Sequence, residues 1–239
     1  MGAVRKMIEP YQDRFQAGQA LAEVLQVYAN ASPVVLALPR GGVPVALPIA
    51  QALNAPLDVV MARKIGAPND KGCGLGAVID GPASRWVVNQ DRLEFLNPPA
   101  GWFEAERDRQ LSDLKGLRRL YCGNRPPVSL KGRTVILADD GLDTGGTARV
   151  ALMALAEEAP ARLMLAVPVG ARRVVNALQK LADQIICLAM PEPFQGIGAY
   201  YRQFEPLSDV DVAGLLSYAR HTRTLGRFAH PEPVACLAH

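Results

Sequence analysis

A repeated alternation of short apolar strands and helices constrains the fold of this chain more than any other feature. Residues 34–38 have the all-apolar pattern of a buried strand, residues 43–53 that of a helix, and residues 57–62 that of a second strand. A strand, turn, helix and strand within about thirty residues make a βαβ unit. Such units build a parallel sheet that binds ligands at the carboxyl ends of its strands.

The same alternation returns in the second half of the chain. Strands are predicted at 135–138, 163–169 and 184–188, with helices at 147–159 and 172–182 between them. An amphipathic helix at 13–28, capped by Asp13, precedes the first strand. We therefore expect an α/β fold of three layers, in which a mostly parallel twisted sheet is flanked by helices.

The length of 239 residues suits one domain, since domains usually run to about 100–200 residues. We expect 1–239 to form a single domain with several appendages. The glycine-rich segment 65–76 reads as a mobile loop, and 85–130 as an insertion that holds a strand and a long, largely solvated helix at 103–121. Residues 189–220 are expected to form a C-terminal hood and helix, and 224–239 a flexible tail.

Charge and cysteine usage exclude several classes of partner. The balance of 26 basic and 23 acidic residues gives a net charge of +3, which argues against nucleic acid as a partner. No apolar run reaches the roughly 18 residues of a membrane helix, so no membrane partner is expected. The four cysteines (Cys73, Cys122, Cys187, Cys236) are far apart and form no metal-binding pair, which indicates free thiols and a cytoplasmic location.

The most informative stretch is 135–147, in which a buried strand ends in two adjacent acids and a glycine turn opens a helix. The backbone N–H groups of 143–147, with the Thr144 and Thr147 hydroxyls, suit a phosphate dianion at the positive helix end. Asp139 and Asp140 would accept hydrogen bonds from hydroxyl groups or form the second shell of a divalent cation. The alternative is a strand-to-helix turn with a purely structural role.

This stretch closely resembles the phosphoribosyl pyrophosphate motif of the type I phosphoribosyltransferases. Residues 38–44 resemble the pyrophosphate loop of that family, and Arg63-Lys64 the start of its flexible catalytic loop. Together with 13–18, 63–68, 191–194 and Tyr200-Tyr201, these segments are similar to one bacterial branch of the family, over roughly residues 13–218.

The resemblance implies a role for each matching residue. Asp139 and Asp140 match the acids that bind the ribose hydroxyls. Asp143, Thr144, Gly145, Gly146 and Thr147 match the loop that holds the 5′-phosphate, and Asp143 also takes the place of a general base in the purine salvage members. Arg40, Gly41 and Gly42 match the pyrophosphate loop, and Arg63 and Lys64 would add positive charge.

The implied reaction is attack of a nitrogenous base on C1′ of phosphoribosyl pyrophosphate, with Mg²⁺-pyrophosphate leaving. Arg40, Lys64 and Mg²⁺ would stabilise the charge that grows on pyrophosphate. Taken without the resemblance, two readings stay open. Arg40 with its two glycines can neutralise a bulky anion that the backbone approaches closely, or it can form a common turn. Arg63 and Lys64 can serve the same site or be ordinary surface charges.

Two departures from the bacterial branch leave alternatives open. After Pro68 the chain has Asn-Asp-Lys-Gly-Cys-Gly where relatives usually have Asn-Pro-Glu. Either Lys71 replaces a cation of the catalytic loop, or the loop has lost its usual role. Asp143 stands where the branch often has a small residue.

The acceptor base stays open. Phe194, Tyr200, Tyr201 and Phe204 form an aromatic cluster whose faces could stack a base, and core packing explains them equally well. The partners expected are phosphoribosyl pyrophosphate and a small-molecule base, with a homodimer allowed. The alternative function is a non-catalytic module that binds phosphoribosyl pyrophosphate or a nucleotide. A hydrolase using Asp139 and a metal is poorly supported, because no second acidic cluster follows another strand.

Overall fold

A five-stranded parallel sheet forms the centre of the computed structural model, which describes residues 9–68, 70–80 and 85–224. The side chains of Lys64, of 70–74, of Arg85 and of Val87 lie outside this description. The strand order is β2-β1-β6-β7-β8, with each neighbouring pair parallel. The strands are β1 (Val34–Ala37), β2 (Leu57–Val59), β6 (Thr134–Ala138), β7 (Arg162–Val169) and β8 (Gln184–Ala189).

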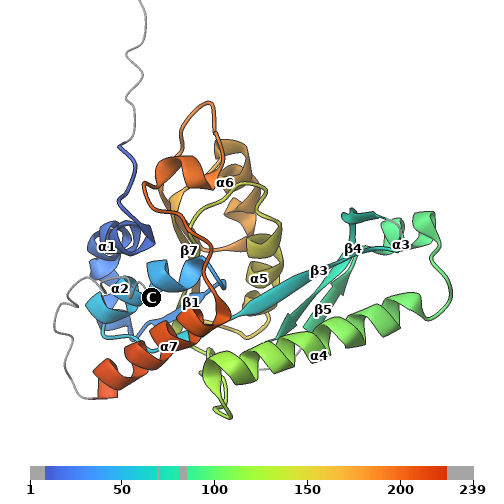
Figure 1. Ribbon diagram of the computed structural model, residues 1–239, viewed down its shortest axis with the longest axis horizontal. Coiled ribbons are helices and arrows are strands. Elements are labelled where there is room, and N and C mark those ends of the chain that lie inside the picture. Colours follow the sequence, from blue (N-terminus) through green and yellow to red (C-terminus); the bar gives the residue numbers. More distant parts are fainter. Residues whose placement is uncertain (1–8, 69, 81–84, 225–239) are drawn as a thin grey trace, which may run out of the picture.

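Helices cover both faces of this sheet (Figure 1). One hydrophobic cluster joins Val35 and Ile136 to α1 (Arg14–Leu25), α2 (Gly42–Ala52) and α7 (Asp209–Thr224). The other joins Val34 and Val135 to α5 (Gly146–Ala156) and α6 (Arg172–Leu178). Because successive strand residues point to opposite faces, an unbroken apolar run supplies both clusters at once. The expected three-layer α/β fold is confirmed.

Two local features position the N-terminal helix. Asp13 caps α1, since its carboxylate accepts a 2.7 Å hydrogen bond from the Gln16 backbone N–H. Gly18 lies where a Cβ atom would come within 2.3 Å of the Val45 carbonyl oxygen, so only glycine allows α1 to pack this closely on α2. The predicted helix at 13–28 ends at Leu25 and continues as the 3₁₀ helix η1 (Gln26–Ala31).

The middle of the chain forms an arm that projects from the body (Figure 1). Its antiparallel sheet has the order β3 (Met61–Ala67), β4 (Asp70–Asp80), β5 (Arg85–Val88). Helix α3 (Gln90–Leu96) follows, and α4 (Trp102–Cys122) packs back along β3 and β4. The expected strand near 86–89 and the long helix are therefore present.

The interpretation of 65–76 as a mobile loop was wrong. Residues 65–67 and 70–76 lie in the two strands of a β-hairpin, and Ile65 and Leu75 are fully buried on the face of the hairpin that α4 covers. The abundant glycines misled the prediction, because glycine is compatible with a strand whose apolar neighbours are covered by a helix. The insertion consequently begins at Met61 and not at residue 85, and the predicted strand at 57–62 is divided between β2 and β3.

The segment expected as a hood, 189–220, divides between two places. The 3₁₀ helix η3 (Ile197–Tyr200) and the chain around it lie near the carboxyl ends of the strands, where Ile197 contacts Gly141. Helix α7 lies elsewhere and packs against α2, α4 and β2. The tail after Thr224 lies outside the described residues, so its expected flexibility stays a prediction.

Two smaller expectations concern membrane spans and cysteines. None of the described helices is both long enough and apolar enough to span a membrane. Cys122 and Cys187 are free thiols, and the side chains of Cys73 and Cys236 lie outside the described part of the chain. Helix α6 ends at Leu178 and is followed by the 3₁₀ helix η2 (Gln179–Leu181).

Candidate functional site

The two acids follow β6 at the carboxyl edge of the sheet, beside the loop that follows β1. The pairing of β1 with β6 continues into this loop, since the Leu38 N–H donates to the Ala138 carbonyl at 3.0 Å. A Cβ atom at Gly41 would lie 2.1 Å from Asp140 Oδ2, and one at Gly42 would lie 2.6 Å from the Ala138 carbonyl oxygen. Both glycines are therefore required for the loop to pack against the acids.

Asp140 is held from two sides by residues distant in the sequence. Arg14 Nε donates to Asp140 Oδ2 at 2.8 Å, and both side chains are largely buried. The Tyr201 hydroxyl donates to the Asp140 carbonyl oxygen at 2.6 Å. Because the carboxylate and the backbone are both anchored, the orientation of Asp140 is set before any ligand binds.

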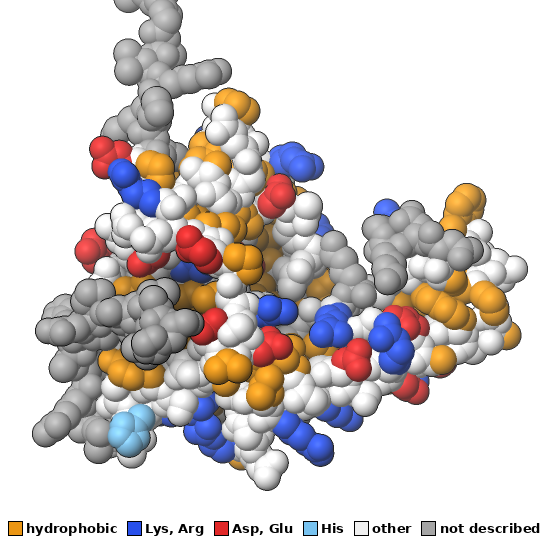
Figure 2. Space-filling model, in the orientation of Figure 1, with side chains coloured by type: hydrophobic (Ala, Val, Ile, Leu, Met, Phe, Trp, Pro, Cys, Tyr) orange, Lys and Arg blue, Asp and Glu red, His pale blue; other side chains and the backbone are white. Residues whose placement is uncertain are grey.

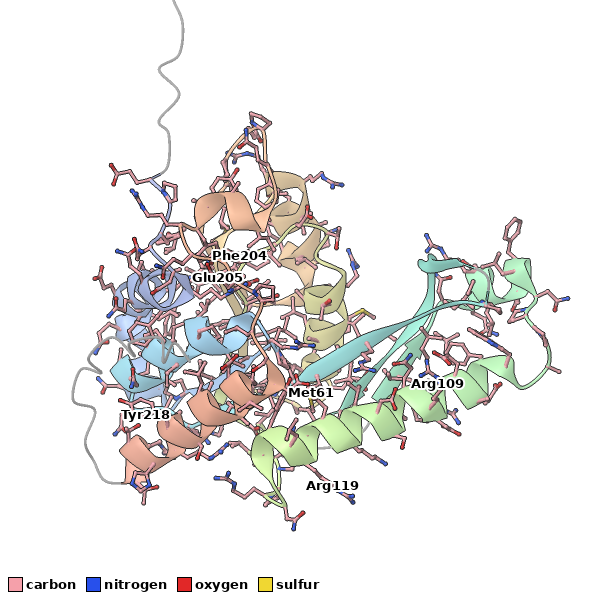
Figure 3. All side chains as sticks on the ribbon, in the orientation of Figure 1. Met61, Arg109, Arg119, Phe204, Glu205 and Tyr218 are labelled. Carbon is pink, nitrogen blue, oxygen red and sulfur yellow. The ribbon has the colours of Figure 1, made fainter. Side chains whose placement is uncertain are left out.

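Arg14 is itself held by the chain after η3. Its guanidinium lies 3.8 Å from the centre of the Phe204 ring and donates to the Glu205 carbonyl at 3.1 Å. Phe204 and Glu205 are labelled in Figure 3. Sequence reasoning missed this residue, although it lies in a segment that resembles the bacterial branch. Arg14 and Asp140 are 126 positions apart, and nothing in the local sequence of either indicates the pair.

Asp139 is in an unfavourable electrostatic environment. Burial and the negative charge of Asp140 raise the pKa of Asp139 well above its usual range, against the smaller opposing effects of a backbone hydrogen bond and Arg14. Its Oδ1 accepts the Asp140 backbone N–H at 2.9 Å. A cation or a pair of hydroxyl donors at this position would stabilise the ionised form of both acids.

The predicted phosphate loop connects β6 to α5. Leu142 N–H donates to the Val169 carbonyl at 2.9 Å, which ties the start of the loop to the end of β7. Gly145 adopts a left-handed φ of +69°, and a Cβ there would lie 2.4 Å from Val174 Cγ1. Asp143, Thr144 and Thr147 are exposed, and no side chain caps the first turn of α5. The loop can thus offer backbone N–H groups to an anion.

Arg40 follows a cis peptide bond at Pro39-Arg40 and directs its side chain toward the start of α7. Its Nη1 donates to the Leu207 carbonyl at 2.8 Å, and its Nε lies 3.2 Å from Asp209 Oδ1. Asp209 also accepts a 2.6 Å hydrogen bond from the Tyr121 hydroxyl on α4. The guanidinium is half exposed, so it can exchange these partners for a bound anion.

The other predicted cations are not gathered beside the acids by any described contact. Arg63 lies on the arm, where its Nη1 is 3.4 Å from Asp113 Oδ2 and 3.3 Å from Gln110 Oε1 on α4. The side chains of Lys64, in β3, and Lys71, in β4, lie outside the described residues. Their roles stay predictions.

The aromatic residues proposed for the base form a packed group. Tyr200 stacks on Phe194 with ring centres 5.6 Å apart, and Tyr201 stacks on Phe204 at 5.0 Å. Tyr200 and Tyr201 are buried, whereas Phe194 is half-buried. Burial of the two tyrosines favours the core-packing alternative for them, and a base-binding role for Phe194 stays a prediction.

Replacing Arg14 tests its effect on the pKa of Asp139. We expect Arg14→Met to raise the pKa of Asp139 further, because a nearby positive charge that lowers this pKa is lost. Breaking the Arg14–Asp140 pair should also cost about 3 kcal/mol of unfolding free energy. Following the Asp139 carboxyl by NMR through the pH range in which it ionises measures the first effect, and Arg14→Lys should restore most of it. A pH profile that matches the natural protein would contradict this account.

The described residues form no preformed metal site, because no three or more of their His, Cys, Asp or Glu side chains are grouped so that they could hold a metal ion. The two acids nevertheless suit an outer-sphere role, because their mutual repulsion would be relieved by a cation that is held mainly by a ligand's own oxygens.

The comparisons with known proteins identify the family of the chain. Residues 6–202 match the model of the phosphoribosyl transferase domain. A protein of Mycobacterium tuberculosis strain H37Rv, whose name assigns it provisionally to the phosphoribosyl transferases, is 36% identical over 209 residues. That match covers 87% of this chain and 47% of the relative, so the chain spans about half the length of the curated relatives that it matches.

Two further proteins are similar over different shares of the chain. The crystal structure of TT1426 from Thermus thermophilus is 39% identical and has a TM-score of 0.75 over 87% of this chain and 97% of that one. A ribose-phosphate pyrophosphokinase of Sulfurisphaera tokodaii is 36% identical over 90 residues, which are 38% of this chain and 28% of that protein. Because the family model matches most of its length, the chain belongs to the phosphoribosyl transferase domain family.

Proposed function

We propose that this chain transfers the 5-phosphoribosyl group of phosphoribosyl pyrophosphate to a nitrogenous base, with Mg²⁺ required and pyrophosphate released. The observation that carries the proposal is the pairing of two acids with an uncapped, glycine-containing turn at the same edge of the sheet. A ribose 5-phosphate has a diol that could bind to the two acids and a phosphate dianion that could bind to the turn.

The acids would bind the ribose ring. With Asp140 fixed by Arg14 and Tyr201, the 2′ and 3′ hydroxyls would donate to Asp139 and Asp140 without any rearrangement of the backbone. The pKa of Asp139 is raised by burial and by Asp140, and hydroxyl donors would favour its ionised form. Binding would thus relieve an unfavourable interaction of the free protein, and this relief would add to the affinity for the ligand.

The loop at 143–147 would hold the 5′-phosphate through backbone N–H groups and the two threonine hydroxyls. Asp143 is exposed at the start of this loop and could receive the proton that the base loses when its nitrogen bonds to C1′. When bound, Mg²⁺ would supply positive charge to the leaving pyrophosphate, with Asp139 and Asp140 in its second shell.

Arg40 would contact pyrophosphate only after it leaves its present partners, Leu207 and Asp209. Its guanidinium now contacts Leu207 and Asp209, so contact with pyrophosphate requires it to leave that ion pair. The same contact favours the second candidate function, a non-catalytic module that binds phosphoribosyl pyrophosphate or a nucleotide. A chain that keeps Arg40 on Asp209 would bind the ligand and fail to stabilise the leaving group.

One experiment separates these functions. The protein is mixed with phosphoribosyl pyrophosphate, Mg²⁺ and a panel of purines, pyrimidines and simple amines, and released pyrophosphate is measured. Release that depends on one acceptor supports transfer and identifies the acceptor. Tight binding by calorimetry without release for any acceptor supports the binding module, and absence of both would reject the site.

A further inference from the structure

A cavity lies at the opposite edge of the sheet from the acids. It has a volume of about 560 Å³ and is lined by the chain that enters β2, by the segment after α4 and by the last turns of α7. Because all five strands are parallel, their amino ends and carboxyl ends lie at opposite edges of the sheet. A five-residue strand such as β6 is about 16 Å long, so the two sites are separated by roughly that distance.

Three arginines line this cavity: Arg125, Arg220 and Arg223. Among the residues that the structure describes, no carboxylate lies within ion-pair distance of any of the three, although Arg125 Nε donates to the Cys122 carbonyl at 3.0 Å. Burial and the neighbouring charge of Arg125 lower the pKa of Arg220 from its usual value. Arg220 is therefore half-buried beside a like charge, whereas Arg125 and Arg223 are exposed, and an anion bound among the three would favour the charged form of Arg220.

The acid in the wall of the cavity is already neutralised. Asp58 is buried, and Arg118 Nη2 lies 3.1 Å from its Oδ2 and 3.3 Å from its Oδ1. The backbone N–H groups of Val59 and Val128 donate to the two oxygens at 2.8 and 3.1 Å. With its oxygens occupied, Asp58 fixes the geometry of the wall and forms no ion pair with the three arginines, although its charge opposes part of the lowering of the Arg220 pKa.

Basic side chains also lie along the edge of the molecule near the cavity. Figure 2 shows Lys and Arg side chains along the edge of the molecule where α4 ends beside α7. The rest of the lining is uncharged and includes Pro56, Leu57, Pro126 and Ala219, with Asn54 and Thr224 able to form hydrogen bonds. The cavity is too large for one phosphate group, and its uncharged wall suits the organic part of a ligand.

We propose that this cavity binds a nucleoside triphosphate or similar polyphosphate ligand, at a site distinct from the one used by phosphoribosyl pyrophosphate. The phosphates would contact Arg125, Arg220 and Arg223, since guanidinium groups donate to phosphate oxygens in pairs. The nucleoside would lie against the prolines and Ala219. This inference does not depend on transferase activity, because it concerns residues at the other edge of the sheet.

The test is a calorimetric titration of the full chain with ATP, GTP, CTP, UTP and inorganic triphosphate, each with and without saturating phosphoribosyl pyrophosphate. We expect at least one triphosphate to bind whether or not phosphoribosyl pyrophosphate is present. The double variant Arg220→Gln with Arg223→Gln should weaken that binding at least about tenfold, because it removes two charge-assisted contacts from the exposed side of a helix. Glutamine favours helix, so α7 should keep its structure.

Arg119→Gln is the matched control. Arg119, labelled on α4 in Figure 3, is exposed near the same edge and does not line the cavity. It should change affinity by no more than about twofold. Equal affinity for inorganic triphosphate and every nucleotide would show that the anion alone is recognised and overturn the nucleoside contact. No binding, displacement by phosphoribosyl pyrophosphate, or binding unchanged in the double variant would overturn the site.

Discussion

Replacing both acids after β6, Asp139→Asn with Asp140→Asn, should weaken the binding of phosphoribosyl pyrophosphate by about 100- to 10,000-fold. Two ribose hydroxyls would each lose a charge-assisted hydrogen bond of roughly 1.5–3 kcal/mol, and the bound Mg²⁺ would lose nearby negative charge. Calorimetric titration with phosphoribosyl pyrophosphate and Mg²⁺ measures the affinity. An affinity equal to that of the natural protein would reject the assignment of these acids to the ribose.

The stability of the single variant Asp139→Asn provides an internal check on that result. The pKa of Asp139 is raised in the folded chain, so folding favours the protonated carboxyl. The contribution of Asp139 to the free energy of unfolding is therefore fully present below the ordinary aspartate range and is lost as pH rises through the raised pKa. Asparagine does not titrate, and the variant should therefore lose less stability than the natural protein on going to alkaline pH. Denaturant unfolding at several pH values measures this difference. A loss of affinity accompanied by retained or improved stability cannot result from misfolding.

Gly41→Ala should have the second largest effect, a loss of about 100-fold in phosphoribosyl pyrophosphate binding or turnover. The new Cβ would lie 2.1 Å from Asp140 Oδ2, and Arg14 holds that carboxylate in place, so the loop after β1 must move. A displacement of about 1 Å at a reacting centre is enough for an effect of this size. Measurement of affinity and of pyrophosphate release would show whether the two fall together.

Gly116→Ala is the matched control for the change at Gly41. Gly116 lies within α4, and a Cβ there has no neighbouring atom within 4 Å. The substitution should leave ligand binding unchanged and raise the unfolding free energy by up to about 1 kcal/mol, because alanine favours helix over glycine. Normal activity in Gly41→Ala would show that the loop and the acids can separate without consequence.

Much of the sheet could be predicted from local sequence. The strands β1, β6, β7 and β8 are short, apolar and bounded by turns, and these properties suffice because β1, β6 and most of β7 are buried on both faces and the edge strand β8 is partly buried. The cap at Asp13 and the turn that opens α5 are also local, since they depend on residues within one helical turn. Segments whose structure depends on a distant partner were predicted less well.

The arm illustrates this difference. Residues 65–76 contain many glycines and look irregular by themselves, yet they form a hairpin because α4 covers the face that carries Ile65 and Leu75. The covering helix is encoded several tens of residues later in the sequence. No local pattern indicates that the two segments meet.

The sequence by itself determined the α/β fold, the order of the strands along the chain and the presence of two acids before a glycine turn, because these follow from periodicity and from adjacent residues. Tertiary structure alone decided which groups surround those acids. Arg14, Gly41 and Tyr201 come from three separate segments and meet at Asp140, because strand pairing and the return of the chain after β8 bring them there. The cationic cavity has the same origin, since Arg125 and Arg220 become neighbours when α7 packs beside the end of α4. Electrostatic interactions depend on separation in space and not along the sequence, so only the folded structure determines which side chains interact.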